Sequence, residues 1–343
     1  MLQKLAEDRA RLVELHSQIL ELARAFATQV QRSVVKERLD TYKYPVLTLP
    51  NEVVAEILVQ FIPKYPACPP PGSLHSPLLL TRICRLWREI AHATPKLWRA
   101  VSLSSRSRIS PNPKNIWLNR AGCFPLAIRM NEVAGYTVDE SSLIAVIVPY
   151  RPRCEYLELR RLDQYVPYLP RIEGEFPLLK HLDLELDQKP DVKIEFSRVP
   201  MLRSAVLDVV AAHSVVLPWS QSTTLSSHTI SLEDCVPVLG KVTDLSECKL
   251  LTCRLMNTFL DSFTLPLLSR LDVCEDLLGP DPISSLTTFV SRSECKLQYL
   301  RISSMKSDSA NSYSAAFPSI REVIFGKHKE EVYSELPRYT TNR

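Results

Sequence analysis

The sequence predicts an α/β chain: an N-terminal helix, then a helical module, then an irregular solenoid of repeated strands with a parallel strand face. Three observations predict it. The chain starts with a long stretch free of Pro and Gly, a second stretch has apolar residues at helical spacing, and a strand-like register recurs to near the end. The expected domains are 1–44, the N-terminal helix; 45–101, the helical module; 102–122, a connector; and 123–343, the solenoid.

The first 39 residues contain no Pro or Gly and predict one long amphipathic helix. Its apolar stripe repeats every seven residues, at Leu5, Leu12, Ile19 and Phe26. Polar residues interrupt the second seam position, so a sustained coiled coil is not expected. The helix is expected to pack on its own protein or to fray, and homodimerisation through it is the alternative.

Two short helices are expected within residues 49–98. The first opens with Pro50, whose missing N–H costs nothing in a first turn, and Glu52 complements the positive helix end. The second opens with Ser76 as N-cap and stops at Pro95. Their apolar faces carry Val53, Val54, Ile57, Leu58 and Phe61 in the first helix, and Leu80, Ile83, Cys84, Trp87, Ile90 and Ala91 in the second. Two short helices cannot bury so much apolar surface alone, so these faces need a partner or a neighbouring domain.

Between the two helices lies an insertion, residues 63–77, that contains six prolines. Polyproline-like backbone makes no internal hydrogen bonds. Its other residues, Cys68, Gly72 and Ser73 among them, offer little to bury. We therefore expect this insertion to be mobile and dispensable for folding, or to serve as a docking peptide.

The rest of the chain repeats a register of the form apolar-x-x-apolar-x-apolar. It occurs at Trp98/Val101/Leu103, Cys123/Leu126/Ile128, Cys154/Leu157/Leu159, Leu179/Leu182/Leu184, Leu202/Ala205/Leu207, Leu225/His228/Ile230, Val242/Leu245/Glu247, Leu268/Leu271/Val273, Leu297/Leu300/Ile302 and Ile320/Val323/Phe325. The first positions are separated by 25, 31, 25, 23, 23, 17, 26, 29 and 23 residues. Most of these steps are typical of leucine-rich repeats. Helical spacing at 141–148, 251–259 and 283–290 supports strand–helix alternation with parallel strands. An ordinary α/β domain with similarly spaced strands is the alternative.

Composition excludes several classes of function. The net charge of +4 is too small over 343 residues for a nucleic-acid binder. The 7 glycines form no phosphate-binding loop, and no histidine or cysteine pair has metal-ligand spacing, so neither a cofactor nor a metal is expected. No segment is long and apolar enough to span a membrane. The nine scattered cysteines favour a reduced setting, cytoplasmic or nuclear. A hydrolase with a dispersed site is the remaining enzyme hypothesis.

Three short motifs carry a family resemblance. The first helix begins Leu-Pro-x-Glu at 49–52, the second carries Cys-x-x-Trp at 84–87, and Leu-Trp follows at 97–98. They resemble the F-box, with which substrate receptors of cullin–RING ubiquitin ligases dock on a Skp-type adaptor. The whole chain resembles F-box proteins of the kind abundant in mushroom-forming fungi, where degenerate leucine-rich repeats follow the box. The insertion at 63–77 departs from a compact F-box.

The resemblance implies a non-catalytic receptor that docks on a Skp-type adaptor, and through it on a cullin, and holds a target protein on its repeats. The expected adaptor-binding residues are Leu49, Pro50, Val53, Ile57, Phe61, Leu80, Ile83, Trp87, Leu97 and Trp98. The alternative for them is a purely intramolecular core that joins the helices to the first repeat. For the whole chain, the alternative is a repeat scaffold that works without a ligase.

The repeat register also predicts a target-binding strip. Side chains two, four and six positions after each first residue point away from the core, onto the concave strand face. The strip consists of Tyr156, Glu158, Asp183, Glu185, Asp208, Asp244, Asp272 and Tyr299. Its acidic middle would attract a basic segment of a target. The alternative is that these are solvated charges covering an exposed sheet.

Overall fold

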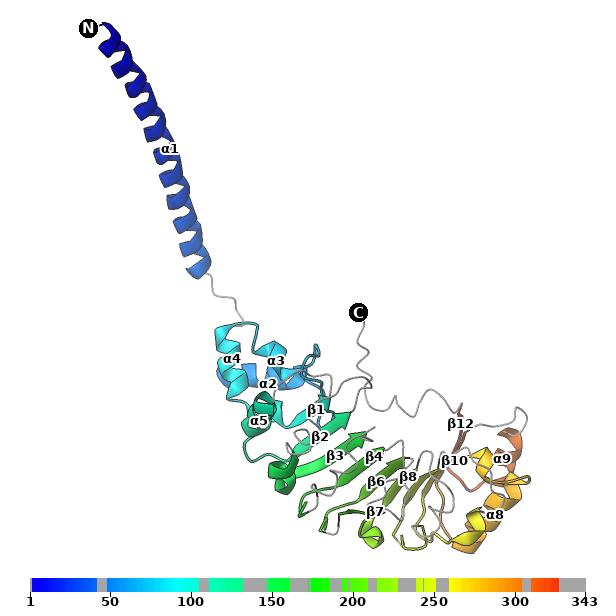
Figure 1. Cartoon of the computed structure of the whole chain (residues 1–343). Coiled ribbons are helices and arrows are strands. Elements are labelled where there is room, and N and C mark those ends of the chain that lie inside the picture. The colour runs from blue at the N-terminus through cyan, green and yellow to red at the C-terminus, as the bar shows by residue number, and fades with distance from the viewer. Residues whose placement is uncertain are drawn as a thin grey trace. The chain divides into compact units, whose positions relative to one another are not determined.

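The computed structural model of the chain (Figure 1) describes residues 2–41, 48–104, 111–131, 147–160, 172, 174–185, 193–196, 198–208, 215–227, 239–242, 244–250, 259–303 and 310–326. It consists of two compact units, residues 1–54 and 55–343, and the boundary between them falls within helix α2 (Asn51–Phe61).

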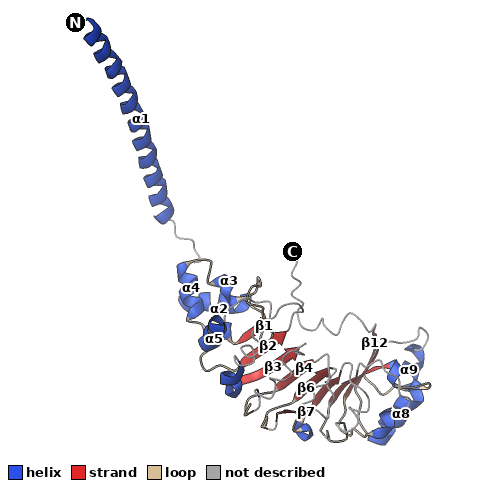
Figure 2. Cartoon of the chain, viewed as in Figure 1, coloured by secondary structure: helices blue, strands red, loops and turns tan. Residues whose placement is uncertain are grey.

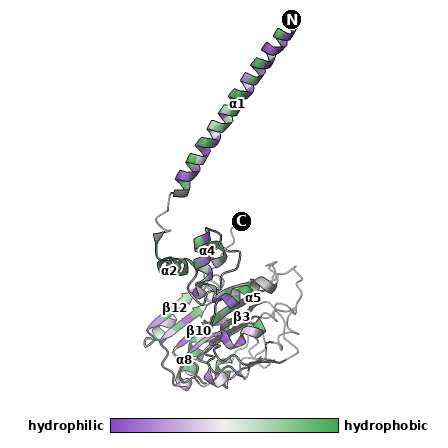
Figure 3. Cartoon of the chain, turned by 90° about the vertical axis from the view of Figure 1, so that its left-hand side faces the viewer, coloured by the Kyte–Doolittle hydropathy of each residue, from purple (hydrophilic) through white to green (hydrophobic). Residues whose placement is uncertain are grey.

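The long N-terminal helix is confirmed as α1 (Leu2–Thr41). All of its described side chains, residues 3–39, are exposed, and Figure 3 shows hydrophobic and hydrophilic residues interleaved along it. The helices among the described residues include none that is both long and apolar enough to cross a lipid bilayer.

The helical module contains α2 and, instead of the single second helix that the spacing predicts, two helices: α3 (Pro77–Leu80) and α4 (Arg85–His92). Ser76 caps α3 as expected, since its Oγ accepts a hydrogen bond from the N–H of Leu78 at 3.2 Å. Cys84 ends the continuity because its backbone is extended and its Sγ accepts from the N–H of Trp87 at 3.4 Å, which makes it the N-cap of α4. A 3₁₀ turn, η2 (Pro95–Trp98), leads into the sheet.

Ten parallel strands form one sheet in chain order, which confirms the predicted α/β class with a parallel strand face (Figure 2). The strands are β1 (Ala100–Ser104), β2 (Leu126–Asn131), β3 (Cys154–Arg160), β4 (His181–Glu185), β6 (Ser204–Asp208), β8 (Thr224–Ser227), β9 (Glu247–Leu250), β10 (Arg270–Cys274), β11 (Tyr299–Ser303) and β12 (Glu322–Gly326). Two short strands, β5 (Ile194–Glu195) and β7 (Val215–Val216), pair separately in parallel.

Short helices and 3₁₀ turns occupy the return segments. They are α5 (Pro111–Arg120), η3 (Val148–Arg153), η6 (Trp219–Gln221), η7 (Phe259–Ser262), η8 (Glu275–Leu277), α8 (Pro282–Ser293) and α9 (Ala310–Ala316). The helix expected at 283–290 is α8, capped by Asp281. The other two, at 141–148 and 251–259, lie almost wholly outside the described residues. The expected connector, 102–122, contains most of β1 and all of α5, so the sheet starts before the boundary that the sequence suggested.

The strand pairing corrects the repeat register in three places. One in-register column of the core runs through Val101, Ile128, Leu157, Leu182, Ala205, Leu225, Cys248, Leu271, Leu300 and Val323. The predicted register was right for seven repeats and wrong at β2, β8 and β9, whose first positions are Pro125, Ser222 and Leu245.

With these first positions the steps become 27, 29, 25, 23, 20, 23, 23, 29 and 23 residues. All lie within the 20–29 residues of leucine-rich repeats, and the anomalous step of 17 disappears. The errors have a physical cause. Leu126 precedes a register shift in β2, while small residues, Ser222 and Cys248, hold buried positions where the pattern demanded a large apolar side chain.

Trp98 joins the helical module to the first repeat. Its side chain is fully buried, its Nε1 donates to the carbonyl oxygen of Ala91 at 2.8 Å, and its ring meets that of Trp117 edge-on at 5.2 Å. One residue thus links α4, the start of the sheet and α5. The part of the module that belongs to the second unit is therefore packed onto the first strands of the sheet.

Candidate protein-binding surfaces

Six of the ten predicted adaptor-binding residues are exposed, although all are apolar. In the first unit they are Leu49, Pro50 and Val53, and in the second they are Ile57, Phe61 and Ile83. Ile57 and Phe61 are each 42% exposed and lie four residues apart, on one face of α2. Ile83, in the turn before α4, is 55% exposed. Large apolar side chains left this open are candidates for burial by a partner.

One further exposed residue was missed by the sequence reading. Leu74, inside the insertion, is 74% exposed, and its neighbour His75 packs its ring 5.8 Å from that of Phe61. This contact brings the end of the insertion against the end of α2. No sequence signal marked Leu74, because it stands alone between prolines rather than in a periodic pattern.

The other four predicted adaptor-binding residues are not exposed to solvent as these six are. Leu80, Leu97 and Trp98 are buried within the protein, as the alternative of an intramolecular core expects, and their contact with an adaptor stays a prediction. Trp87 is half-buried. Apolar residues at helical spacing can face either the interior or the solvent, and the spacing alone could not say which of them face inward.

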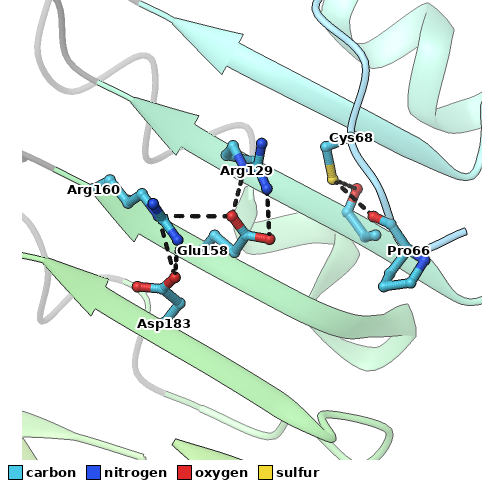
Figure 4. A network of polar contacts seen from close by, with 7 residues as sticks. Pro66, Cys68, Arg129, Glu158, Arg160 and Asp183 are labelled. Carbon is cyan, nitrogen blue, oxygen red and sulfur yellow. Dashed lines mark hydrogen bonds and ion pairs between the residues drawn. The ribbon is translucent and has the colours of Figure 1, made fainter. Parts of the chain in front are cut away.

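The second candidate surface is the side of the sheet opposite the core, named here the polar strand face. It consists of the residues flanking the core positions on each strand. At β2–β4 its charged groups form an unbroken chain across three strands (Figure 4). Glu158 accepts hydrogen bonds from the guanidinium of Arg129, including one of 3.0 Å to Nη2, and Arg160 lies between Glu158, at 3.7 Å, and Asp183, at 3.1 Å from Nε.

These groups are charge-paired rather than free. Glu158 is 7% exposed and Asp183 is 3% exposed. Burial is the largest influence on Asp183 and raises the pKa of its carboxyl to about 6, against the opposing pull of Arg160. Burial also lowers the pKa of His181, whose Nδ1 lies 3.0 Å from the Oγ of Ser204.

The described side chains place only part of the predicted acidic strip on the strand face. The two central strands, β6 and β8, present Ser204, Val206, Thr224 and Ser226. Asp244 precedes β9 and lies off its strand, because the register there is shifted by three residues. The side chain of Asp208 lies outside the described residues. Whether Tyr156, Glu158, Asp183, Glu185 or the others bind a target stays a prediction.

A second set of ion pairs lies on β9 and β10. The Nζ of Lys249 lies 3.7 Å from Asp272, and the Nε of Arg270 lies 3.9 Å from Glu247. The guanidinium carbon of Arg270 also stands 4.2 Å from the ring centroid of Tyr299. Among the described side chains, the polar strand face thus has two charge-paired patches, one on β2–β4 and one on β9–β10, while those on β6 and β8 between them carry no charge.

The insertion covers the first two strands of the polar strand face, contrary to the expectation that it buries little. Cys68, drawn in Figure 4, is 3% exposed. It packs with Ala100 and Ala127. The carbonyl oxygen of Pro69 accepts a hydrogen bond from the N–H of Ser102 at 3.2 Å. A signal for this packing was present in the sequence: the first outward position holds alanine on β1 and β2, whereas every later strand of the sheet carries a polar side chain there.

Tyr65 extends this packing onto the third strand. Its hydroxyl donates to Glu155 at 2.6 Å, and its ring meets that of Tyr156 edge-on at 5.4 Å. Glu155 also pairs with Lys180 at 2.5 Å. The N-terminal end of the polar strand face is therefore an ordered aromatic patch built partly from the insertion.

No group of three or more potential metal-ligating side chains gathers among the described residues. The described residues of the two candidate surfaces offer apolar and paired polar contacts of the kind that proteins use to bind one another.

Comparisons with known proteins identify no family. No family model matches the chain, and no curated protein matches it in sequence. Among solved structures, the crystal structure of the Rad7 and Elc1 complex in yeast is similar at 13% sequence identity and a TM-score of 0.40, over 89% of this chain and 93% of that chain. A likeness at that level carries no argument about function.

Proposed function

We propose that this protein is a substrate-receptor subunit of a cullin–RING ubiquitin ligase, located in the cytoplasm or nucleus, that catalyses no reaction itself. The observation that carries the proposal is the exposure of Ile57 and Phe61 on α2 and of Ile83 before α4. These residues belong to the segment whose motifs resemble an F-box. Binding of a Skp-type adaptor would bury them.

The packing of the helical module supports a receptor that holds its target at a fixed distance from the adaptor. Trp98 is buried between α4 and α5, and the insertion is hydrogen-bonded to β1. A rigid connection raises the effective concentration of target lysines near the ubiquitin-loaded partner more than a flexible one would. The target would lie on the polar strand face.

The same packing favours a second candidate, a repeat scaffold that acts without a ligase. Leu80, Leu97 and Trp98 serve the fold, so the helical module is a complete N-terminal cap for the sheet. Under this hypothesis the exposed apolar residues bind some other protein.

Co-expression with a Skp-type adaptor separates the two candidates. A stoichiometric complex that survives gel filtration supports the receptor. A chain that elutes without the adaptor, while its thermal unfolding stays cooperative, contradicts the receptor and favours the scaffold. A pull-down from native extract, repeated after proteasome inhibition, then identifies targets as proteins enriched by the inhibition.

A further inference from the structure

A pocket of about 260 Å³ opens between the C-terminal end of α2, the insertion and the start of β1, all within the second unit. It adjoins the N-terminal end of the polar strand face, with which it shares Tyr65 and Ala100. Part of its lining is apolar, and three cations complete it: Lys64, Lys96 and Arg99. Lys64 and Lys96 are exposed, and Arg99 is half-buried.

The positive charges of this pocket are not neutralised by acidic residues of its own lining. Its lining contains no acidic side chain, and among the described residues neither Lys64 nor Lys96 forms an ion pair. The nearby carboxylate of Glu155 does not line the pocket; it is bonded to Tyr65 and Lys180 and also attracts the guanidinium of Arg99. The C-terminal end of α2 contributes only about half a negative charge, against three positive ones.

Arg99 has a buried hydrogen-bond donor without an acceptor among the described residues. Its guanidinium carbon stands 3.5 Å above the ring centroid of Tyr65, and its Nε is buried without a hydrogen-bond partner among the described residues. A buried N–H without an acceptor costs free energy, which a bound acceptor would recover. The stacking on Tyr65 holds the guanidinium in place before any ligand arrives.

We propose that this pocket binds one anionic side chain of a partner protein, phosphorylated or carboxylate, together with the apolar part of that side chain. The volume is near the lower end for ligand pockets and suits a single side chain rather than a cofactor. Lys64, Lys96 and Arg99 neutralise the anionic group, and Val59, Ile62 and Leu97 contact the apolar part. The inference does not depend on the ligase role.

The test is titration calorimetry of the full chain, without adaptor, with three small probes: phenyl phosphate, 3-phenylpropionate and neutral phenol. The variant Lys64→Gln/Lys96→Gln removes two cations that are exposed and serve no packing role. Lys241→Gln/Lys296→Gln removes the same charge from exposed lysines elsewhere in the same unit. We expect phenyl phosphate to bind, the pocket variant to weaken it by about tenfold or more, and the control variant to leave it unchanged.

Tighter binding of phenyl phosphate than of 3-phenylpropionate would identify a phosphorylated partner side chain, and equal binding an acidic one. Three results would overturn the proposal: no binding of either anion at millimolar concentration, equal binding of phenol, or equal binding by the pocket variant with its thermal unfolding unchanged. Because no adaptor is present, none of these results bears on the ligase proposal.

Discussion

The thiol of Cys68 donates to the backbone carbonyl oxygen of Ala127 at 3.4 Å, so a proline-rich insertion and the second strand of the sheet are packed against each other. The two residues are 59 positions apart in the chain. Cys68, from an insertion that the sequence presents as a loose loop, thus forms a small buried cluster with Ala100 and Ala127 on the first two strands of the sheet. This contact makes the insertion a structural part of the protein. Loss of the contact should therefore lower the free energy of unfolding.

Enlarging Ala127 should therefore destabilise the protein. Ala127→Leu would push against Cys68, and overpacking of this kind costs about 1–3 kcal/mol of the free energy of unfolding. Thr224→Leu is the matched control, because Thr224 holds the equivalent outward position on β8. Urea unfolding measures both. Equal stability of the two variants would show that the insertion does not press on β2.

Thiol reactivity should report the same packing. Burial raises the pKa of Cys68 to about 12, and the side chain is 3% exposed, so it should stay unmodified in the native protein. Cys123 is exposed and should react first. Mass spectrometry of a brief alkylation gives the order. Modification of Cys68 as fast as Cys123 would mean that the insertion opens readily.

The stability of the sheet should depend on pH through Asp183. Its folded pKa, about 6, is above that of an unfolded Asp, about 3.9, so the folded state binds more protons in this interval. Its contribution to stability is fully present below about pH 4 and is lost as the pH rises through 6. The lowered pKa of His181 acts oppositely, because its contribution is lost as the pH falls through about 6.5.

Comparison of Asp183→Asn with wild type isolates the first effect. The difference in the free energy of unfolding between the two proteins should change with pH between about 4 and 6 and be flat outside that interval. His181→Gln in the same series removes the opposing effect. A constant difference across the whole range would show that Asp183 keeps an ordinary pKa in the folded protein.

Truncation of two apolar residues of the helical module should change the free energy of unfolding by very different amounts. Trp98→Ala removes a fully buried indole and should cost about 3–5 kcal/mol of the free energy of unfolding. Ile83→Ala, at a residue 55% exposed, should change it by less than about 0.5 kcal/mol. Thermal and urea unfolding measure both. A large loss at Ile83 would place that residue in the core and remove it from the candidate adaptor contacts.

The sequence was informative where periodicity alone determines structure. The long helix, the cap at Ser76 and seven of the ten strand registers follow from apolar spacing and local hydrogen bonding. Two of the three register errors occurred where a small residue occupies a buried site, as Ser222 and Cys248 do, because apolar patterns identify core positions by large side chains. The third, in β2, accompanies a register shift after Leu126. The packing of Cys68 on Ala127 could not be read directly either, since it depends on tertiary contact between distant segments.

The candidate surfaces were harder to predict than the fold. Periodicity found the apolar residues of the helical module, but whether Ile57 faces solvent and Leu80 faces the core depends on how the helices pack. The charge pairing within the predicted acidic strip could not be predicted for a related reason. Arginines from the same and neighbouring strands neutralise Glu158 and Asp183, and this pairing requires the cross-strand register.

The most direct test of the proposed receptor role is the dissociation constant for a Skp-type adaptor, measured by calorimetry for three proteins. These are wild type, Ile57→Asp/Phe61→Asp, and Met201→Asp/Leu267→Asp, whose wild-type residues are apolar and 41% and 58% exposed elsewhere in the same unit. We expect the α2 variant to weaken binding by at least about a hundredfold, equivalent to ~2.7 kcal/mol, as expected for two buried interface residues, and the control to match wild type. Equal affinity of all three proteins, or no binding by wild type, would contradict the proposal.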